Sequence, residues 1–285
     1  MEFRTVVDIP KPGFQIEPCE EMLFVGSCFA DSIGQRFREE QFRATVNPYG
    51  GMYNPASILH TVERFEGNPR VVFLTLGTNH VYRLRETGEI VDNCQKRPAA
   101  LFREEQLTVD ECADYLRRTV EVLRSRRPDV QVVLTVSPIR YRKYGYHESQ
   151  LSKATLLLAV EKVCSGLNGL TRTSQPHEFR ESPCMSVAYF PAYEIVLDEL
   201  RDYRFYRDDM LHPSSQAVEY IWQQLVEYYF SPVARQFLSE WAPLKAALAH
   251  RPFNPDSEDY LTFITATKAK AEALLEYYGS RSHSD

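Results

Sequence analysis

The stretch Met22-Leu23-Phe24-Val25-Gly26-Ser27-Cys28-Phe29-Ala30 decides the fold of this chain. Its first four residues form an apolar run that ends at a glycine, which is typical of a buried parallel strand. From Phe29 onward, apolar residues recur every four positions, at Ile33 and Phe37, as on the buried face of a helix. The segment therefore predicts a strand, a tight turn and a helix that lies on a sheet.

The same alternation of strand and helix continues along the chain. Apolar runs bounded by turn residues predict further strands at residues 43–46, 71–76, 130–136 and 187–190. Helices are predicted from Asn54-Pro55 to about residue 65, from the capping box of Thr108 and Glu111, over residues 151–164, and after Pro213. A hairpin is expected within residues 81–91, near Thr87-Gly88. This order indicates a mostly parallel sheet covered by helices on both faces.

Composition and charge exclude several classes of function. The chain has 285 residues and a formal net charge of −6, so no general positive field attracts nucleic acid. The six cysteines form no C-x-x-C pair, and the seven histidines lack metal-ligand spacing, so we expect no metal and no cofactor. No run approaches the roughly 20 apolar residues of a membrane span. We therefore expect no membrane partner and a cytoplasmic protein with reduced thiols.

Three segments carry side chains suited to catalysis at the carboxyl ends of predicted strands, where ligands bind in open parallel sheets, and a fourth lies in the loop before the helix that follows Pro213. Gly26-Ser27-Cys28 places a nucleophile at a strand-to-helix turn, where the helix N-terminus favours its anion. Gly50 follows the second strand and can bring a backbone N–H close to a substrate. Asn79 follows the third strand, and its amide can donate to an oxyanion. In the fourth segment, Asp209 can orient His212 as a general base.

These segments resemble a known family. Gly26-Ser27-Cys28-Phe29-Ala30 is similar to the signature of the GSCFA family, which resembles a branch of the SGNH/GDSL-hydrolase superfamily. Further similar strings occur over roughly residues 20–225: Asn47-Pro48-Tyr49-Gly50, Gly77-Thr78, Ser137-Pro138-Ile139-Arg140, Gln150-Leu151-Ser152-Lys153-Ala154, Tyr189-Phe190-Pro191-Ala192-Tyr193-Glu194 and Arg201-Asp202-Tyr203-Arg204-Phe205-Tyr206. The resemblance implies a three-layer α/β/α flavodoxin-like fold and ester chemistry on O-acyl groups such as carbohydrate acetates. Two departures are the short segment before Val71 and Tyr141, which stands where the family would have a histidine.

The nucleophile has two candidates in this stretch. Aligning Gly26 with the glycine of the superfamily's Gly-Asp-Ser motif puts Cys28 over the nucleophilic serine. This alignment predicts that Cys28 is the nucleophile. Ser27 remains the alternative if the turn is shifted by one residue. A buried structural cysteine is the default for any single free thiol, and catalysis is favoured here because Asn79, Asp209 and His212 accompany it. His80, next to Asn79, is expected to be an ordinary loop histidine and not a ligand.

The sequence thus predicts an SGNH-type α/β domain over residues 1–231 and a C-terminal helical extension over residues 232–285, broken near Pro252. It predicts an esterase or O-acyltransferase with a Cys28–His212–Asp209 triad and an oxyanion hole from the N–H groups of Cys28 and Gly50 and from Asn79. Its partners would be a small-molecule or carbohydrate ester and, for a transferase, an acyl donor. The alternative is a non-catalytic carbohydrate-binding or scaffold protein that keeps the fold. The oligomeric state stays open.

Overall fold

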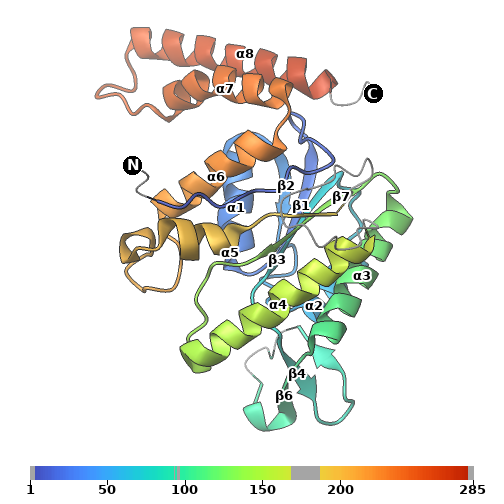
Figure 1. Ribbon diagram of the computed structural model, residues 1–285. Helices are drawn as coiled ribbons and strands as arrows, with labels where there is room; N and C mark the ends of the chain where they lie inside the picture. Colours follow the sequence, from blue (N-terminus) through green and yellow to red (C-terminus); the bar gives the residue numbers. More distant parts are fainter. Residues whose placement is uncertain (1–3, 93, 95–96, 168–186, 282–285) are drawn as a thin grey trace.

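A five-stranded parallel sheet forms the centre of the molecule (Figure 1). The structure is a computed structural model that describes residues 4–92, 94, 97–167 and 187–281. The strand order is β2-β1-β3-β7-β8. The bounds are β1 Glu21–Gly26, β2 Arg43–Val46, β3 Val71–Leu76, β7 Gln131–Val136 and β8 Val187–Tyr189. Every residue of β3 is buried, which confirms the strand predicted from its unbroken apolar run.

Helices cover both faces of this sheet. One face carries α1 (Cys28–Glu39) and α6 (Ser215–Tyr229), and the other carries α2 (Pro55–Arg64), α3 (Val109–Arg126) and α4 (Gly145–Leu167). Alternate residues of β1 supply the two cores, with Phe24 in the first and Leu23 and Val25 in the second. The predicted three-layer α/β architecture is therefore confirmed, although α4 begins at Gly145, earlier than its apolar pattern suggested.

A small antiparallel sheet of three strands lies beside the helical layer of α2, α3 and α4, at the bottom of Figure 1. It contains β4 (His80–Leu84), β5 (Ile90–Val91) and β6 (Phe102–Gln106), in the order β5-β4-β6. The hairpin of β4 and β5 is the predicted one, with Gly88 in the left-handed region at φ 74°. The predicted loop position of His80 is wrong, because this residue begins β4 and is buried.

Short helical turns connect β8 to α6. They are α5 (Ala192–Glu194), a π-helix (Ile195–Leu200) and a 3-10 turn (Tyr203–Phe205), while another 3-10 turn (Ala99–Leu101) precedes β6. None of these has an apolar period long enough to predict from sequence.

Two further helices follow the α/β layers, with the predicted break between them: α7 (Pro232–Ala249) and α8 (Glu258–Arg281). The indole Nε1 of Trp241 on α7 donates to the carbonyl of Glu39 at the end of α1, at 3.3 Å. The rings of Phe237 and Tyr278 pack edge to face with centroids 5.2 Å apart, which joins α7 to α8. Residues of both helices share the core cluster that contains α1 and α6.

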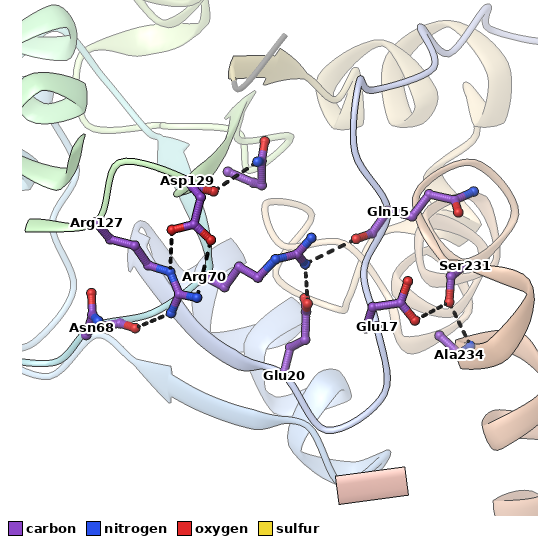
Figure 2. Close-up of polar contacts among 10 residues, drawn as sticks. Gln15, Glu17, Glu20, Asn68, Arg70, Arg127, Asp129, Ser231 and Ala234 are labelled. Atoms are coloured by element: carbon purple, nitrogen blue, oxygen red, sulfur yellow. Dashed lines mark hydrogen bonds and ion pairs between the residues drawn. The ribbon is translucent and has the colours of Figure 1, made fainter. Parts of the chain in front are cut away.

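Polar contacts tie together the amino ends of the strands (Figure 2). Arg70, directly before β3, pairs with Glu20, directly before β1. Arg127 donates to Asp129, which precedes β7, at 3.0 Å. Ser231, the cap of α7, donates to Glu17 at 2.7 Å. This edge is thus occupied by structural ion pairs, and the candidate catalytic residues lie after the opposite ends of the strands.

Candidate functional site

The turn between β1 and α1 requires glycine at its first position. Gly26 has φ 149°, and a Cβ added there would lie 2.1 Å from the carbonyl oxygen of Thr75 on β3. Only a residue without a side chain lets β1 end this close to its neighbour. The close approach places Ser27 and Cys28 at the first turn of α1.

Ser27 and Cys28 differ in what their side chains do. The Ser27 hydroxyl is buried, accepts the N–H of Phe29 at 3.3 Å as the cap of α1, and lies 3.4 Å from the Thr75 hydroxyl. Cys28 is the first residue of α1, and its side chain is half-buried. Its Sγ lies 3.6 Å from the hydroxyl oxygen of Tyr53. Cys28 therefore lies at a helix N-terminus, beside a hydroxyl that can donate a hydrogen bond to its sulfur.

The loop after β2 lies against this turn. Asn47 accepts the N–H of Gly26 at 2.9 Å, and Met52 donates its N–H to the Gly26 carbonyl at 2.8 Å. The N–H of Gly50, predicted to face the substrate, donates instead to the Asn47 carbonyl at 2.9 Å within the loop. Gly51 lies nearer to the Cys28 turn, because a Cβ added there would be 3.6 Å from the Tyr53 hydroxyl and 3.7 Å from the Gly26 carbonyl oxygen.

Tyr53 is a site residue that sequence reasoning missed. It stands between the Gly50-Gly51 turn and Asn54, the cap of α2, and neither feature signals a contact with Cys28. The hydrogen bond with Cys28, together with burial, raises the pKa of the Tyr53 hydroxyl to about 12. The hydroxyl therefore keeps its proton at neutral pH and can donate to the Cys28 sulfur.

Asn79 makes two buried contacts beyond the end of β3. Its side-chain nitrogen donates to the carbonyl of Leu107 at 2.7 Å, and its backbone N–H donates to the Ser152 hydroxyl at 2.9 Å. One of its two amide protons is thus engaged in holding the segment that follows β6. The oxyanion role of Asn79 stays a prediction, and the geometry adds a structural role that the sequence did not indicate.

Asp209 and His212 form the pair expected of an oriented general base. Asp209 Oδ2 lies 2.6 Å from His212 Nδ1, while Oδ1 accepts the N–H groups of Leu211 and His212 at 2.8 and 3.0 Å. These backbone N–H groups and the imidazole lower the pKa of the Asp209 carboxyl to about 2. The carboxylate is therefore ionised at neutral pH, and it directs His212 Nε2 away from itself.

The turn that holds this pair is docked on the segment after β7. The Arg140 N–H donates to the Leu211 carbonyl at 3.1 Å, and its guanidinium donates to the Met210 carbonyl at 3.2 Å. Cys28 follows β1 and Arg140 follows β7, with β3 between these strands, so all these residues lie beyond the carboxyl edge of one sheet. Within the described part of the chain, no hydrogen bond joins Cys28 directly to His212.

Lys153 is a second residue whose place sequence reasoning missed. It lies on α4, is 3% exposed, and its Nζ donates to the carbonyls of Gly77 and Ser137, each at 2.7 Å. These carbonyls directly follow β3 and β7. Burial lowers the pKa of the Lys153 ammonium to about 7. The lysine thus fixes the ends of two central strands next to the site.

The remaining sequence predictions concern cysteines, metals and membranes. Cys19 and Cys112 are buried, Cys94 and Cys164 are half-buried, and Cys184 lies outside the described residues. Over the ranges that the structure describes, no group of three or more His, Cys, Asp or Glu side chains is placed to hold a metal ion. In the same ranges, no helix is both long and apolar enough to cross a membrane.

Comparisons with known proteins identify similar chains. The model of the GSCFA family matches residues 21–70 and 65–225, and a model described as the GSCFA domain protein, C-terminal domain, matches residues 241–281. No curated protein matches the chain.

Among solved structures, the chain is similar to a protein described as a GDSL-like lipase from Parabacteroides merdae, at 13% identity and a TM-score of 0.48, over 77% of this chain and 98% of the other. It is also similar to an acetyl esterase mutant with an acetate ion, at 13% identity and a TM-score of 0.42, over 78% and 99%. A carbohydrate esterase family 3 protein from Talaromyces cellulolyticus is similar at 13% identity and a TM-score of 0.38, over 77% and 98%.

Proposed function

This chain belongs to the GSCFA family, and from that premise and the site geometry we propose that it is an acyl-ester hydrolase or O-acyltransferase of the SGNH type. Cys28 is the nucleophile, His212 the general base, and Asp209 the residue that orients His212. The observation that carries this proposal is the 2.6 Å contact between Asp209 and His212, with Asp209 held by two backbone N–H groups. Such an arrangement fixes the imidazole tautomer that a base needs.

The proposed reaction has two stages. His212 takes the proton of Cys28, directly or through one water, and the sulfur attacks the ester carbonyl. The backbone N–H of Cys28, at the start of α1, is a donor for the oxyanion, and Asn79 is the second proposed donor. The alcohol leaves with the proton from His212, which gives a thioester on Cys28. Water or a hydroxyl acceptor then takes the acyl group.

Support for Cys28 over Ser27 comes from the difference in their surroundings. The Ser27 hydroxyl is buried and caps α1, so attack by its oxygen would break the helix cap. The Cys28 thiol is half-buried and has a hydroxyl donor beside it.

The proposed substrate class is an acetyl ester of a carbohydrate. Beside the Asp209–His212 turn, the guanidinium of Arg140 lies 4.3 Å from the ring centroid of Tyr146 and 5.8 Å from that of Tyr203. Both tyrosines are exposed, and exposed aromatic faces are surfaces on which sugar rings pack. A cytoplasmic location remains part of the proposal.

The test is to trap the acyl-enzyme with 4-nitrophenyl acetate. We expect an acetyl group on the Cys28 peptide by mass spectrometry, and loss of both acetylation and turnover in Cys28→Ala. Cys164→Ala is the matched control, because burial raises the pKa of that half-buried thiol to about 12 and keeps it protonated. Acetyl on residue 27, with full activity in Cys28→Ala, would move the role to Ser27. Full activity in both Cys28→Ala and Ser27→Ala would rule out the acyl-enzyme mechanism.

A further inference from the structure

A cavity lies against the loop that leads from β2 to Tyr53. Its volume is about 370 Å³, and its walls come from this loop, from α2, and from β5 with the residues that follow it. Tyr49, His60, Arg64, Asp92 and Arg97 supply its polar groups. None of them is used by the proposed acyl transfer.

The acidic residue of this cavity is neutralised from two sides. Asp92 Oδ1 lies 2.7 Å from His60 Nδ1, and Oδ2 accepts from Arg64 Nη2 at 2.8 Å. Both carboxylate oxygens are thus occupied by cationic or polar partners. Arg97 adds another positive charge. The set formed by His60, Arg64, Asp92 and Arg97 is therefore net positive even when His60 is neutral.

Several donors of this set have no acceptor in the described chain. Arg64 Nε donates to the His60 carbonyl at 3.1 Å and Nη2 to Asp92, which leaves Nη1. The Arg97 guanidinium makes one hydrogen bond within the described residues, from Nε to the Cys94 carbonyl at 3.4 Å. His60 turns Nδ1 to Asp92, so that Nε2 is the nitrogen available to a ligand.

The two guanidinium groups rest on aromatic rings. Arg64 lies 4.7 Å from the ring centroid of Tyr49, and Arg97 lies 4.9 Å from that of Phe102. Stacking holds one face of each guanidinium and leaves its N–H edge for planar oxyanions, which arginine binds with two parallel hydrogen bonds. We propose that this cavity binds a small molecule through a phosphate or carboxylate group, with Arg64, Arg97 and His60 as the donors.

The loop connects this cavity to the Cys28 site. The Tyr49 hydroxyl donates to the Arg64 carbonyl at 3.0 Å, and three residues later Met52 is bonded to Gly26. Tyr53 then reaches Cys28. A ligand in the cavity therefore binds a short segment whose other end contacts the proposed nucleophile, although its binding does not depend on the esterase proposal.

Protonation of His60 strengthens the expected anion binding. The hydrogen bond that His60 donates to Asp92 raises the pKa of the His60 imidazole, burial opposes it, Glu63 also raises it and Arg64 lowers it. Arg97 is the other charged group that lines the cavity. When the pH falls through this raised pKa, His60 gains its proton, and Nε2 becomes a charged donor.

Isothermal titration calorimetry with the full chain tests the proposal. The probes are inorganic phosphate and formate at pH 7, and sulfate, whose charge is constant, at pH 6 and 8. We expect saturable binding that weakens about tenfold or more in Arg97→Gln and in Arg64→Gln. Arg235→Gln on α7 is the matched control, since it removes the same charge far from the cavity. Sulfate should bind more tightly at pH 6 than at pH 8.

The two probes at pH 7 separate the two ligand classes. Binding of phosphate alone assigns a phosphate ligand, and binding of formate alone assigns a carboxylate. The proposal is overturned if neither phosphate nor formate shows saturable binding. It is also overturned if Arg235→Gln weakens binding as much as Arg97→Gln does. Arg97 is exposed, and its side chain makes one hydrogen bond of 3.4 Å and one ring contact within the described residues, so its variant remains informative if Arg64→Gln is destabilised.

Discussion

The Sγ atom of Cys28 lies 3.6 Å from the hydroxyl oxygen of Tyr53, which belongs to a different loop. Cys28 comes directly after β1, and Tyr53 comes after β2, at the start of the segment that leads into α2. The parallel pairing of these two strands brings their carboxyl ends together. The thiol at the N-terminus of α1 thereby gains a neighbouring hydroxyl that can donate a hydrogen bond to its sulfur.

Tyr53→Phe removes this donor and leaves the aromatic ring. We expect alkylation of Cys28 by iodoacetamide at pH 7 to slow by about three- to tenfold, because the thiolate that reacts with iodoacetamide loses a hydrogen-bond donor. The melting temperature should change little, since Tyr53 is 41% exposed. Peptide mass spectrometry after brief labelling measures the rate of alkylation at each cysteine. Tyr260→Phe, which removes a hydroxyl from α8, is the control, and an equal effect in both variants would rule out the contact.

Asp209→Asn tests the orientation of His212. The side-chain oxygen of Asn can still accept the two backbone N–H groups, so we expect a change of melting temperature within about 2 °C. Its NH2 group would donate to His212 Nδ1 and place the imidazole proton on Nε2, where the base must be free. The kcat for 4-nitrophenyl acetate should therefore fall by about 10³- to 10⁴-fold. Asp208→Asn is the neighbouring control, and comparable kcat values for the two variants would contradict the assigned role.

Asn79→Ala separates two roles of one amide. Loss of the buried bond to the Leu107 carbonyl should lower the free energy of unfolding by about 1–3 kcal/mol, which thermal or urea unfolding measures. If Asn79 also serves the oxyanion, kcat should fall by about 10²- to 10³-fold at a temperature where the variant is fully folded. A decrease in kcat of less than about tenfold under those conditions would leave only the structural role.

The central sheet could be predicted from local pattern, because each strand is a short apolar run that ends at turn residues. Val71–Leu76 is buried over its whole length, so its sequence alone carries the signal. β6 could not be found in this way. Its sequence Phe102-Arg103-Glu104-Glu105-Gln106 has a single fully buried residue, and what makes it a strand is its antiparallel pairing with β4.

The candidate site likewise contains residues that the sequence could predict and residues that it could not. The Asp209–His212 pair could be predicted, because a three-residue separation within one turn determines its contact. Tyr53 and Lys153 could not be assigned, since Tyr53 meets Cys28 and Lys153 meets Gly77 only after distant strands have paired. The bond of the Gly50 N–H to the Asn47 carbonyl could not be predicted either, because the direction of a backbone N–H depends on the turn that the loop adopts.

Lys153 gives a prediction for the pH dependence of stability. Its pKa is lowered by burial from the usual 10.5 to about 7, whereas the unfolded chain keeps the usual value. Between these values the unfolded state binds more protons, so the free energy of unfolding rises as the pH increases from about 7 toward 10. Below pH 7 the cost of burying the charge is fully present.

Lys153→Met should remove this contribution, which is on the order of 1 kcal/mol per pH unit. The variant also leaves the carbonyls of Gly77 and Ser137 without their donor, and that loss lowers stability equally at every pH. The difference in slope between pH 7 and 10, measured by urea unfolding, is therefore the informative quantity. Lys162→Met, on the exposed face of α4, is the control and should keep the wild-type slope. A wild-type slope in Lys153→Met would mean that Lys153 stays charged in the folded protein throughout this range.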